Sequence, residues 1–229
     1  MLKLTDFSAS YGQSTVIDKL SLEIKKGEIV ALLGRNGMGK TTLMKSIMGL
    51  IKHNSGSLTL DGHNLMGLKS YERVAAGLGY VPQGRMIFNT LTVTENITTG
   101  MIVSKTAEVP PYVYRIFPIL KEFAKRKGGN LSGGQQQQLA IARALVTKPK
   151  MLILDEPTEG IQPSIISEMS DILRQIRDEF GLTIFVSEQV LSFALSVADR
   201  ILVIEKGQIV YDSPASQADG SKIETYLSV

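Results

Sequence analysis

The chain has 229 residues, of which 43% are hydrophobic and 21% charged, with a formal net charge of +3 and no cysteine. This composition predicts a folded domain with a real core and excludes a disordered chain, a collagen-like repeat and any site built on disulfides or cysteine thiolates. Charges of both signs are interspersed, no signal-peptide pattern opens the chain, and no apolar run approaches the roughly 18–20 residues of a membrane span, so we expect a cytosolic protein that does not bind nucleic acid.

The first third of the chain alternates strand and helix patterns. Alternating apolar positions at 2–6 and 16–24 predict half-buried antiparallel strands, whereas the nearly all-apolar run 28–33 predicts a strand buried on both faces. The other elements expected here are a helix from Lys40 to about Leu50, a strand and turn at 57–62, a helix from Tyr71 to Ala76 capped by Ser70, and a strand at 78–83.

The pattern changes after Gln83. Thr92 and Glu95 have the spacing of a capping box, and a second helix is expected after a Pro-Pro pair, so residues 84–140 are predicted to form a helical insertion. Strands separated by helices then return, which implies a parallel sheet with right-handed crossovers. The expected elements are helices at 133–147, 164–180 and 190–198 and strands at 151–155, 182–187, 201–205 and 208–212. We expect the glutamine run 135–138 to lie on a solvated helix face.

A glycine-rich loop after the buried strand 28–33 fits the pattern G-x-x-x-x-G-K-[ST]. Its glycines let backbone N–H groups turn toward an anion without a Cβ clash, and the next helix presents its positive end to the same phosphates. The lysine neutralises β- and γ-phosphate charge, and the threonine after it can bind Mg²⁺. We therefore expect ATP or GTP to bind at Gly34, Arg35, Asn36, Gly37, Met38, Gly39, Lys40, Thr41 and Thr42.

Two adjacent carboxylates end the apolar run 151–155. Asp155 is placed at the carboxyl edge of a buried parallel strand, where α/β sheets bind ligands, and it suits a role beside Mg²⁺. Glu156 points the other way, toward a γ-phosphate, where it could activate the attacking water as a general base.

A second glycine motif opens the helix expected at 133–147. Ser132 is a good N-cap, and the glycines leave the helix N-terminus free for an anion. One nucleotide does not need two such sites in one subunit, so we expect two subunits to meet head to tail, each presenting Ser132 and Gly134 to the other's γ-phosphate. The motif consists of Leu131, Ser132, Gly133, Gly134 and Gln135.

The phosphate loop, Gln83 after a strand, the LSGGQ motif and the MLILDEP motif, in this order and spacing, resemble the ATP-binding subunit of an ABC transporter over essentially the whole chain. The resemblance implies a RecA-like P-loop α/β core with an N-terminal antiparallel β-subdomain, formed by residues 1–83 and 141–229. It implies that 84–140 form a helical signature subdomain. It also implies ATP hydrolysis with Mg²⁺ as cofactor.

The resemblance also carries over roles for single residues. Tyr11 is the aromatic residue that stacks on adenine, and Gln83 is the loop glutamine that touches Mg²⁺ or water and relays to the helical insertion. The implied metal ligands are Thr41, Gln83 and Asp155, and the implied catalytic residues are Glu156, Gln189 and Gln83. Arg85, Met86 and Phe88 are expected in the cleft that receives a cytoplasmic helix of a membrane subunit.

The stretches 77–88, 131–146 and 155–166 resemble importers of branched-chain amino acids and the related urea importers, and their Gln-Gly-Arg and four-glutamine forms are most similar to the urea type. This implies the motor subunit of an importer of a small polar solute, urea, with branched-chain amino acids as the alternative. The implied partners are two transmembrane permease subunits, a second ATP-binding subunit and, indirectly, an extracytoplasmic solute-binding protein. The implied location is the cytoplasmic face of the membrane.

The chain departs from the family pattern at two places. Gln189 stands where the family has a switch histidine, beside Glu188, and Ile161-Gln162 stand where a Leu-Asp pair is usual. We therefore expect pairing with a non-identical ATPase subunit and two unequal sites. A soluble ABC ATPase acting on nucleic acid or ribosomes, a regulatory module that binds nucleotide without hydrolysis, and an exporter subunit are the other readings.

Overall fold

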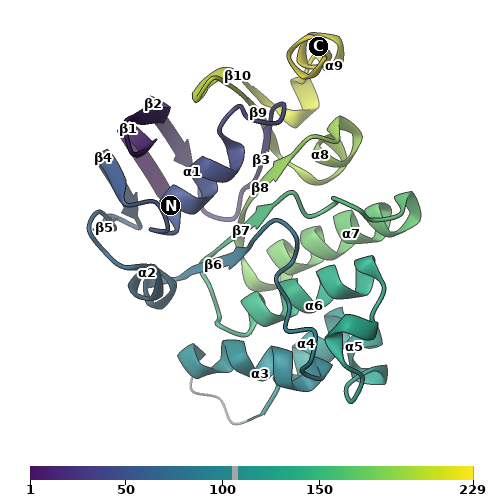
Figure 1. The fold of residues 1–229 in the computed structure, drawn as a ribbon. Coiled ribbons are helices and arrows are strands. Elements are labelled where there is room, and N and C mark those ends of the chain that lie inside the picture. Colours follow the sequence, from purple (N-terminus) through teal and green to yellow (C-terminus); the bar gives the residue numbers. More distant parts are fainter. Residues whose placement is uncertain (105–107, 229) are drawn as a thin grey trace.

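The computed structural model describes residues 1–104 and 108–228 (Figure 1). Within them, a six-stranded sheet runs through the centre in the order β10-β9-β3-β8-β7-β6, parallel from β9 to β6, with β10 as an antiparallel edge. The predicted parallel sheet is therefore confirmed. Its strands are β3 (Ile29–Leu33), β6 (Leu78–Val81), β7 (Met151–Asp155), β8 (Thr183–Glu188), β9 (Arg200–Glu205) and β10 (Gln208–Pro214).

Strand β3 separates two hydrophobic cores. Successive side chains of a strand point to opposite faces, and all five residues of β3 are apolar, so both faces can be buried. Val30 and Leu32 contribute to one core, while Ile29, Ala31 and Leu33 contribute to the other. The strand that leads into the phosphate loop is thus held rigidly from both sides.

The first core lies between the central sheet and a four-stranded antiparallel sheet of order β2-β1-β4-β5. Helix α1 (Lys40–Ile47) packs in this space, with Leu43, Met44 and Ile47 fully buried. Met44 is therefore core filling, as its helical spacing predicts. The strands are β1 (Leu2–Tyr11), β2 (Ser14–Ile24), β4 (His53–Leu60) and β5 (His63–Asn64).

The second core lies under a layer of helices at the bottom and right of Figure 1. The predicted capping box is confirmed, because the carboxylate of Glu95 accepts the N–H of Thr92 at 2.7 Å and the hydroxyl of Thr92 accepts the N–H of Glu95 at 3.2 Å. The helices are α3 (Val93–Ser104), α4 (Pro111–Ile116), α5 (Pro118–Glu122), α6 (Gly133–Leu145), α7 (Pro163–Phe180) and α8 (Leu191–Val197).

Local expectations were wrong at two helices. Helix α2 (Ser70–Ala76) begins at Ser70, so its N-cap is Lys69, whose N–H donates to the Glu72 carboxylate at 2.7 Å. In α6, Gln137 and Gln138 are buried, with 3% and 5% of their surface exposed, because α3, α5 and α7 pack around this helix and leave it no fully solvated face. The C-terminal helix α9 (Gly220–Leu227) was not predicted from the sequence. No helix in the described part of the chain has the length and apolar character to cross a membrane.

The turn between β9 and β10 meets the phosphate loop. The N–H of Gly207 donates to the carbonyl of Met38 at 3.0 Å, and a Cβ on Gly207 would lie 1.9 Å from the carbonyl oxygen of Val16. Because Gly207 also has a φ of +79°, only glycine fits here. The turn therefore sets the distance between the phosphate loop and β2.

We expect Gly207→Ala to lower the free energy of unfolding by about 3–5 kcal/mol, since overpacking against backbone adds to left-handed strain. The matched control is Gly12→Ala, where φ is +59° but nothing lies within 4 Å of an added Cβ, so only the strain of about 1–2 kcal/mol applies. Urea denaturation of both variants measures the difference. Equal losses at the two positions would contradict the close approach at Gly207.

Candidate functional site

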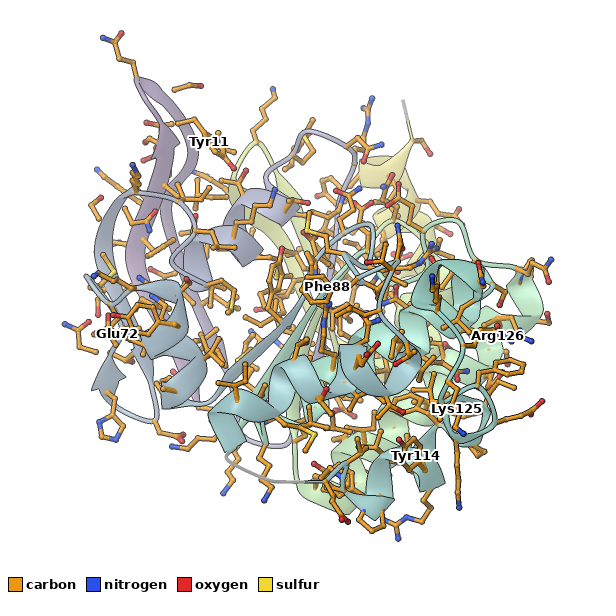
Figure 2. The ribbon with its side chains drawn as sticks, turned by 60° about the horizontal axis from the view of Figure 1, so that its bottom comes forward. Tyr11, Glu72, Phe88, Tyr114, Lys125 and Arg126 are labelled. Atoms are coloured by element: carbon orange, nitrogen blue, oxygen red, sulfur yellow. The ribbon has the colours of Figure 1, made fainter. Side chains whose placement is uncertain are left out.

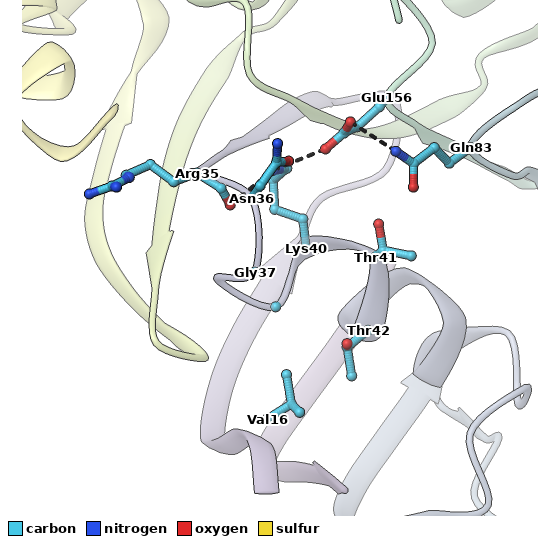
Figure 3. A pocket seen from close by; sticks show the side chains of 10 residues that line it. Val16, Arg35, Asn36, Gly37, Lys40, Thr41, Thr42, Gln83 and Glu156 are labelled. Carbon is cyan, nitrogen blue, oxygen red and sulfur yellow. Dashed lines mark hydrogen bonds and ion pairs between the residues drawn. The ribbon is translucent and has the colours of Figure 1, made fainter. Parts of the chain in front are cut away.

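The phosphate loop surrounds a cavity of about 190 Å³ at the carboxyl edge of the central sheet (Figure 3). Gly37 and Gly39 have φ values of +81° and +107°, conformations that L side chains rarely adopt, which explains both glycines of the motif. Helix α1 begins directly after them, so its N-terminal N–H groups border the cavity. The cavity is lined by Val16, Arg35, Asn36, Gly37, Gly39, Lys40, Thr41, Thr42, Gln83 and Glu156.

Lys40 is a buried cation, with 4% of its surface exposed. Its Nζ forms an ion pair with Glu156 at 3.0 Å and donates to the carbonyl oxygens of Gly34 at 2.6 Å and Arg35 at 3.2 Å. A buried ammonium without such acceptors would be strongly unfavourable. All three N–H donors of the ammonium therefore have an acceptor, two in the phosphate loop and one in the Glu156 carboxylate.

Asp155 ends β7 and is held by three hydroxyl groups. Its carboxylate accepts from Ser187 at 2.6 Å, from Thr41 at 3.1 Å and from Tyr80 at 3.3 Å. Burial raises the pKa of the Asp155 carboxyl, and the hydrogen bonds from Ser187 and Thr41 oppose this shift. Burial and the neighbouring Asp155 carboxylate raise the pKa of Tyr80, which keeps its phenol protonated as a donor.

Glu156 follows Asp155 with a φ of +48°, a strained conformation for a residue with a Cβ. Beside its ion pair with Lys40, its carboxylate accepts from Gln189 at 2.9 Å and from Gln83 at 3.3 Å. Figure 3 shows Lys40 and Gln83 reaching this carboxylate from different segments. The structure therefore brings together Lys40, Gln83, Glu156 and Gln189, which are far apart in the sequence.

Glu188, beside Gln189, points away from this cluster. It is 2% exposed, and its carboxylate accepts from the Thr158 hydroxyl at 2.7 Å, the Thr158 N–H at 3.0 Å and the Gln189 N–H at 3.0 Å. Burial raises the pKa of Glu188, and the bonds from Thr158 oppose the shift. Glu188 thus joins the loop that carries Gln189 to the loop that follows Glu156, and it brings no negative charge into the cavity.

The second glycine motif lies outside the cavity lining. Ser132 is the N-cap of α6, as predicted, and it exchanges backbone and side-chain hydrogen bonds with Gln135. A Cβ on Gly134 would lie 2.6 Å from a methyl group of Ile165, so this glycine allows α6 and α7 to pack closely. Leu131 is buried, whereas Ser132 and Gly133 reach the surface.

Other predicted residues lie around the cavity rather than in it. Tyr11 ends β1 and is 50% exposed, at the far edge of the hairpin in Figure 2. Met38 packs against the first core, and Gly34 borders a neighbouring cavity with Gln189. Ser187 and Tyr80 were not predicted as site residues. Ser187 ends the predicted strand 182–187, which is a signal that could have found it, whereas Tyr80 lies inside the predicted strand 78–83 and has no such signal.

The side-chain oxygens around Asp155 are suitable ligands for a magnesium ion. The hydroxyl of Thr41, the carboxylate of Asp155 and the side-chain oxygen of Gln83 are hard oxygen ligands, which Mg²⁺ prefers. The Thr41 and Asp155 oxygens already lie 3.1 Å apart at the edge of the cavity. Within the described residues no cluster of three or more His, Cys, Asp or Glu offers another metal site.

Comparison with known proteins identifies the family of the chain. The family model described as ABC transporter matches residues 17–159. A high-affinity branched-chain amino acid transport ATP-binding protein, BraG of Pseudomonas aeruginosa, is 41% identical over 99% of both chains. The chain belongs to the ABC transporter family. A probable branched-chain amino acid transport ATP-binding protein of Archaeoglobus fulgidus is 36% identical over 95% of this chain and 93% of its own.

Solved structures agree with this assignment of the ABC family. A dimeric post-hydrolysis state of the ATP-binding cassette MJ0796, bound to ADP and phosphate, superposes with a TM-score of 0.83 at 26% identity and covers 94% of this chain and 99% of the other. The RecA-like α/β fold with its antiparallel β-subdomain and helical insert is therefore confirmed. The chain is an ATP-binding motor subunit of an ABC importer and an ATPase.

We expect Ser187→Ala to lower the free energy of unfolding by about 1–3 kcal/mol, because the buried Asp155 carboxylate loses its shortest hydrogen bond. ATP turnover should also fall about ten- to a hundredfold, since Asp155 and Glu156 are no longer fixed. The control is Ser192→Ala, which removes the hydroxyl of an exposed serine on α8. Steady-state ATPase assays and denaturant titrations measure both effects, and unchanged turnover in Ser187→Ala would argue against this orienting role.

Proposed function

We propose that the cavity binds MgATP and that Glu156 activates the attacking water. The observation that carries the proposal is the buried Lys40–Glu156 pair at 3.0 Å, with Gln83 and Gln189 on the same carboxylate. A triphosphate in the cavity offers Lys40 a stronger anionic partner, and Glu156 is then free to take a proton from water. Gln189 donates to the γ-phosphate in place of a histidine, and Tyr11 stacks on the adenine.

Mg²⁺ would be held by Thr41, Gln83 and Asp155, and when bound it supplies positive charge against the β- and γ-phosphate oxygens. The chain's own residues orient and neutralise the phosphates and accept the proton. The backbone N–H groups of 37–42 orient the phosphates, Lys40 neutralises them, and the Ser187 hydroxyl keeps Asp155 facing Thr41. Glu156 accepts the proton that the attacking water loses.

The glycine motif at 131–135 is available to contact a nucleotide bound by a companion subunit. Ser132 and Gly133 lie at the surface, outside the cavity of their own chain. An N-terminal helix end with an accessible serine is a ready anion site, and the relative MJ0796 has been solved as a dimer. We propose that the motif completes the site of a companion ATPase subunit, and that Gln189, Ile161 and Gln162 make the two sites unequal.

An apolar groove of about 500 Å³ supports a permease contact. Leu50, Met86 and Phe88 are 50%, 65% and 49% exposed, an unusual display of large apolar side chains on one surface. We propose that a cytoplasmic permease helix docks here, at the cytoplasmic face of the membrane. Arg85, expected in this cleft, is not in its lining, because its side chain turns toward the loop after Glu156. The groove is lined by Met48, Leu50, Val74, Leu78, Gly79, Tyr80, Pro82, Met86, Phe88, Thr99, Gly100, Arg143, Ala144 and Thr147.

The relatives support a proposal for the solute. Two of them, from a bacterium and an archaeon, are branched-chain amino acid transport proteins that align along nearly the whole chain. We propose a branched-chain amino acid as the cargo, delivered by an extracytoplasmic solute-binding protein to two permease subunits. Urea, expected from the Gln-Gly-Arg and four-glutamine forms, receives no support from these relatives.

We expect Glu156→Gln to bind MgATP as tightly as the wild type, with turnover lowered about 10²- to 10⁴-fold and the closed dimer accumulating. The amide keeps an oxygen acceptor for Lys40, so the loop stays folded. Phosphate release, nucleotide titration and light scattering measure the three effects. Wild-type turnover in this variant would reject the general-base role of Glu156.

A deletion strain tests the cargo. We expect it to lose accumulation of radiolabelled leucine and to regain it with the wild-type gene but not with Glu156→Gln. Labelled urea serves as the comparison in the same cells. Loss of urea uptake with leucine uptake intact would overturn the proposed cargo while leaving the ATPase mechanism untouched.

A further inference from the structure

Gln83 is followed by three residues with left-handed backbone, Gly84, Arg85 and Met86, whose φ values are +74°, +66° and +45°. Such a run is strained for residues with a Cβ, and strain of this kind persists where the surrounding structure holds it. It sends successive side chains in different directions. Met86 enters the apolar groove, whereas Arg85 turns toward the loop that follows Glu156.

The Arg85 guanidinium contacts the backbone of that loop. Its Nη2 donates to the carbonyl oxygen of Glu159 at 2.7 Å and reaches that of Gly160 at 3.4 Å. These two carbonyls lie three and four residues after Glu156, between the Thr158 contact with Glu188 and the start of α7. Hydrogen bonds from a charged donor are the stronger class, so Arg85 is the main brace on this side of the loop.

The backbone of Arg85 is held in turn by a residue that lines the groove. Its backbone carbonyl accepts from Nη2 of Arg143 at 3.3 Å, and the Arg143 guanidinium lies 5.4 Å from the centre of the Phe88 ring. Arg143 and Phe88 both line the apolar groove. Figure 2 shows Phe88 near the middle of this face, between the strands and the helical side. An unbroken series of contacts therefore runs from the groove through Arg143 and Arg85 to the loop after Glu156.

We infer that Arg85 is a positioning residue for ATP hydrolysis, which holds the loop 157–161 in place behind Glu156 and ties its position to the groove. The inference rests on the proposed function, since the groove is taken as the permease contact and Glu156 as the base. A change at Phe88 or Arg143 shifts the Arg85 backbone, and the two carbonyls follow its side chain. Glu188 holds the same loop from its other side through Thr158.

The test removes the guanidinium without straining the chain. Glycine suits a φ of +66°, so Arg85→Gly deletes the brace while relieving the left-handed strain of the local backbone, and the thermal midpoint of the variant reports whether it stays folded. Arg85→Lys keeps the charge but not the forked geometry. The matched control is Arg126→Ala, which removes another arginine of the helical insert, stacked on Phe123 and distant from Phe88 in Figure 2.

In the assembled transporter, we expect Arg85→Gly to lower kcat about tenfold or more, equivalent to ~1.4 kcal/mol, with the KM for MgATP unchanged. Arg85→Lys should keep part of the wild-type kcat, and the control Arg126→Ala should keep all of it. In the isolated chain, the thermal midpoint of Arg85→Gly should stay close to that of the wild type, because relief of the left-handed strain offsets the lost hydrogen bonds. Hydrogen exchange at the Glu159 and Ile161 amides, which bond within the loop, should become faster.

Two results would overturn the inference. One is wild-type kcat in Arg85→Gly with normal turnover in the control. The other is a joint loss of kcat and MgATP affinity with unchanged loop exchange, which would place Arg85 in the nucleotide site itself. A wild-type chain that fails to bind MgATP would instead reject the proposed function, and this inference with it.

Discussion

A buried ammonium group needs anionic or carbonyl oxygens around it, and this requirement organises the site. Lys40 finds them in the Glu156 carboxylate and two carbonyls of its own loop. Because Glu156 also accepts from Gln83 and Gln189, one carboxylate joins the phosphate loop to the segments after β6 and β8. The left-handed backbone of Glu156 is strained, and such strain persists where the surroundings hold it. Here the Lys40, Gln83 and Gln189 side chains hold the carboxylate, and the backbone N–H donates to the carbonyl of Ser187. The phosphate loop, the segments after β6 and β8, and Glu156 itself therefore respond together when an anion competes for Lys40.

The repeating parts of the fold could be predicted from the sequence. The strand at 151–155 has the expected bounds, and the phosphate loop follows a strand whose five residues are all buried. Such strands are recognisable because burial on both faces favours a nearly continuous run of apolar residues, with the polar residues confined to the strand ends. The order and spacing of the motifs also pointed to the ABC family, which the comparisons confirm. The roles of Tyr11 and of the second glycine motif stay predictions, because they concern a nucleotide and a companion subunit.

Tertiary contacts determined what could not be predicted. Gln137 and Gln138 look solvated when α6 is considered alone, but neighbouring helices surround it on several sides. Arg85 was expected beside Met86 and Phe88, since neighbours in sequence usually share a surface. Three consecutive residues with left-handed backbone turn the Arg85 side chain away from the groove, and the sequence Gln-Gly-Arg-Met does not predict three such residues in a row. The sequence places Glu188 beside Gln189 without giving the direction of its side chain, and the structure turns its carboxylate onto Thr158.

The pairing of β3 has a consequence for how the protein is made. This strand, which leads into the phosphate loop, pairs with β8 and β9, so that Ile29 meets Ile184 and Val30 meets Arg200. During synthesis, the ribosome must release more than three quarters of the chain before β3 has either neighbour. Until then its apolar residues and unpaired backbone are exposed to other nascent chains or to chaperones. The nucleotide cavity therefore matures last, although most of its loop is translated early.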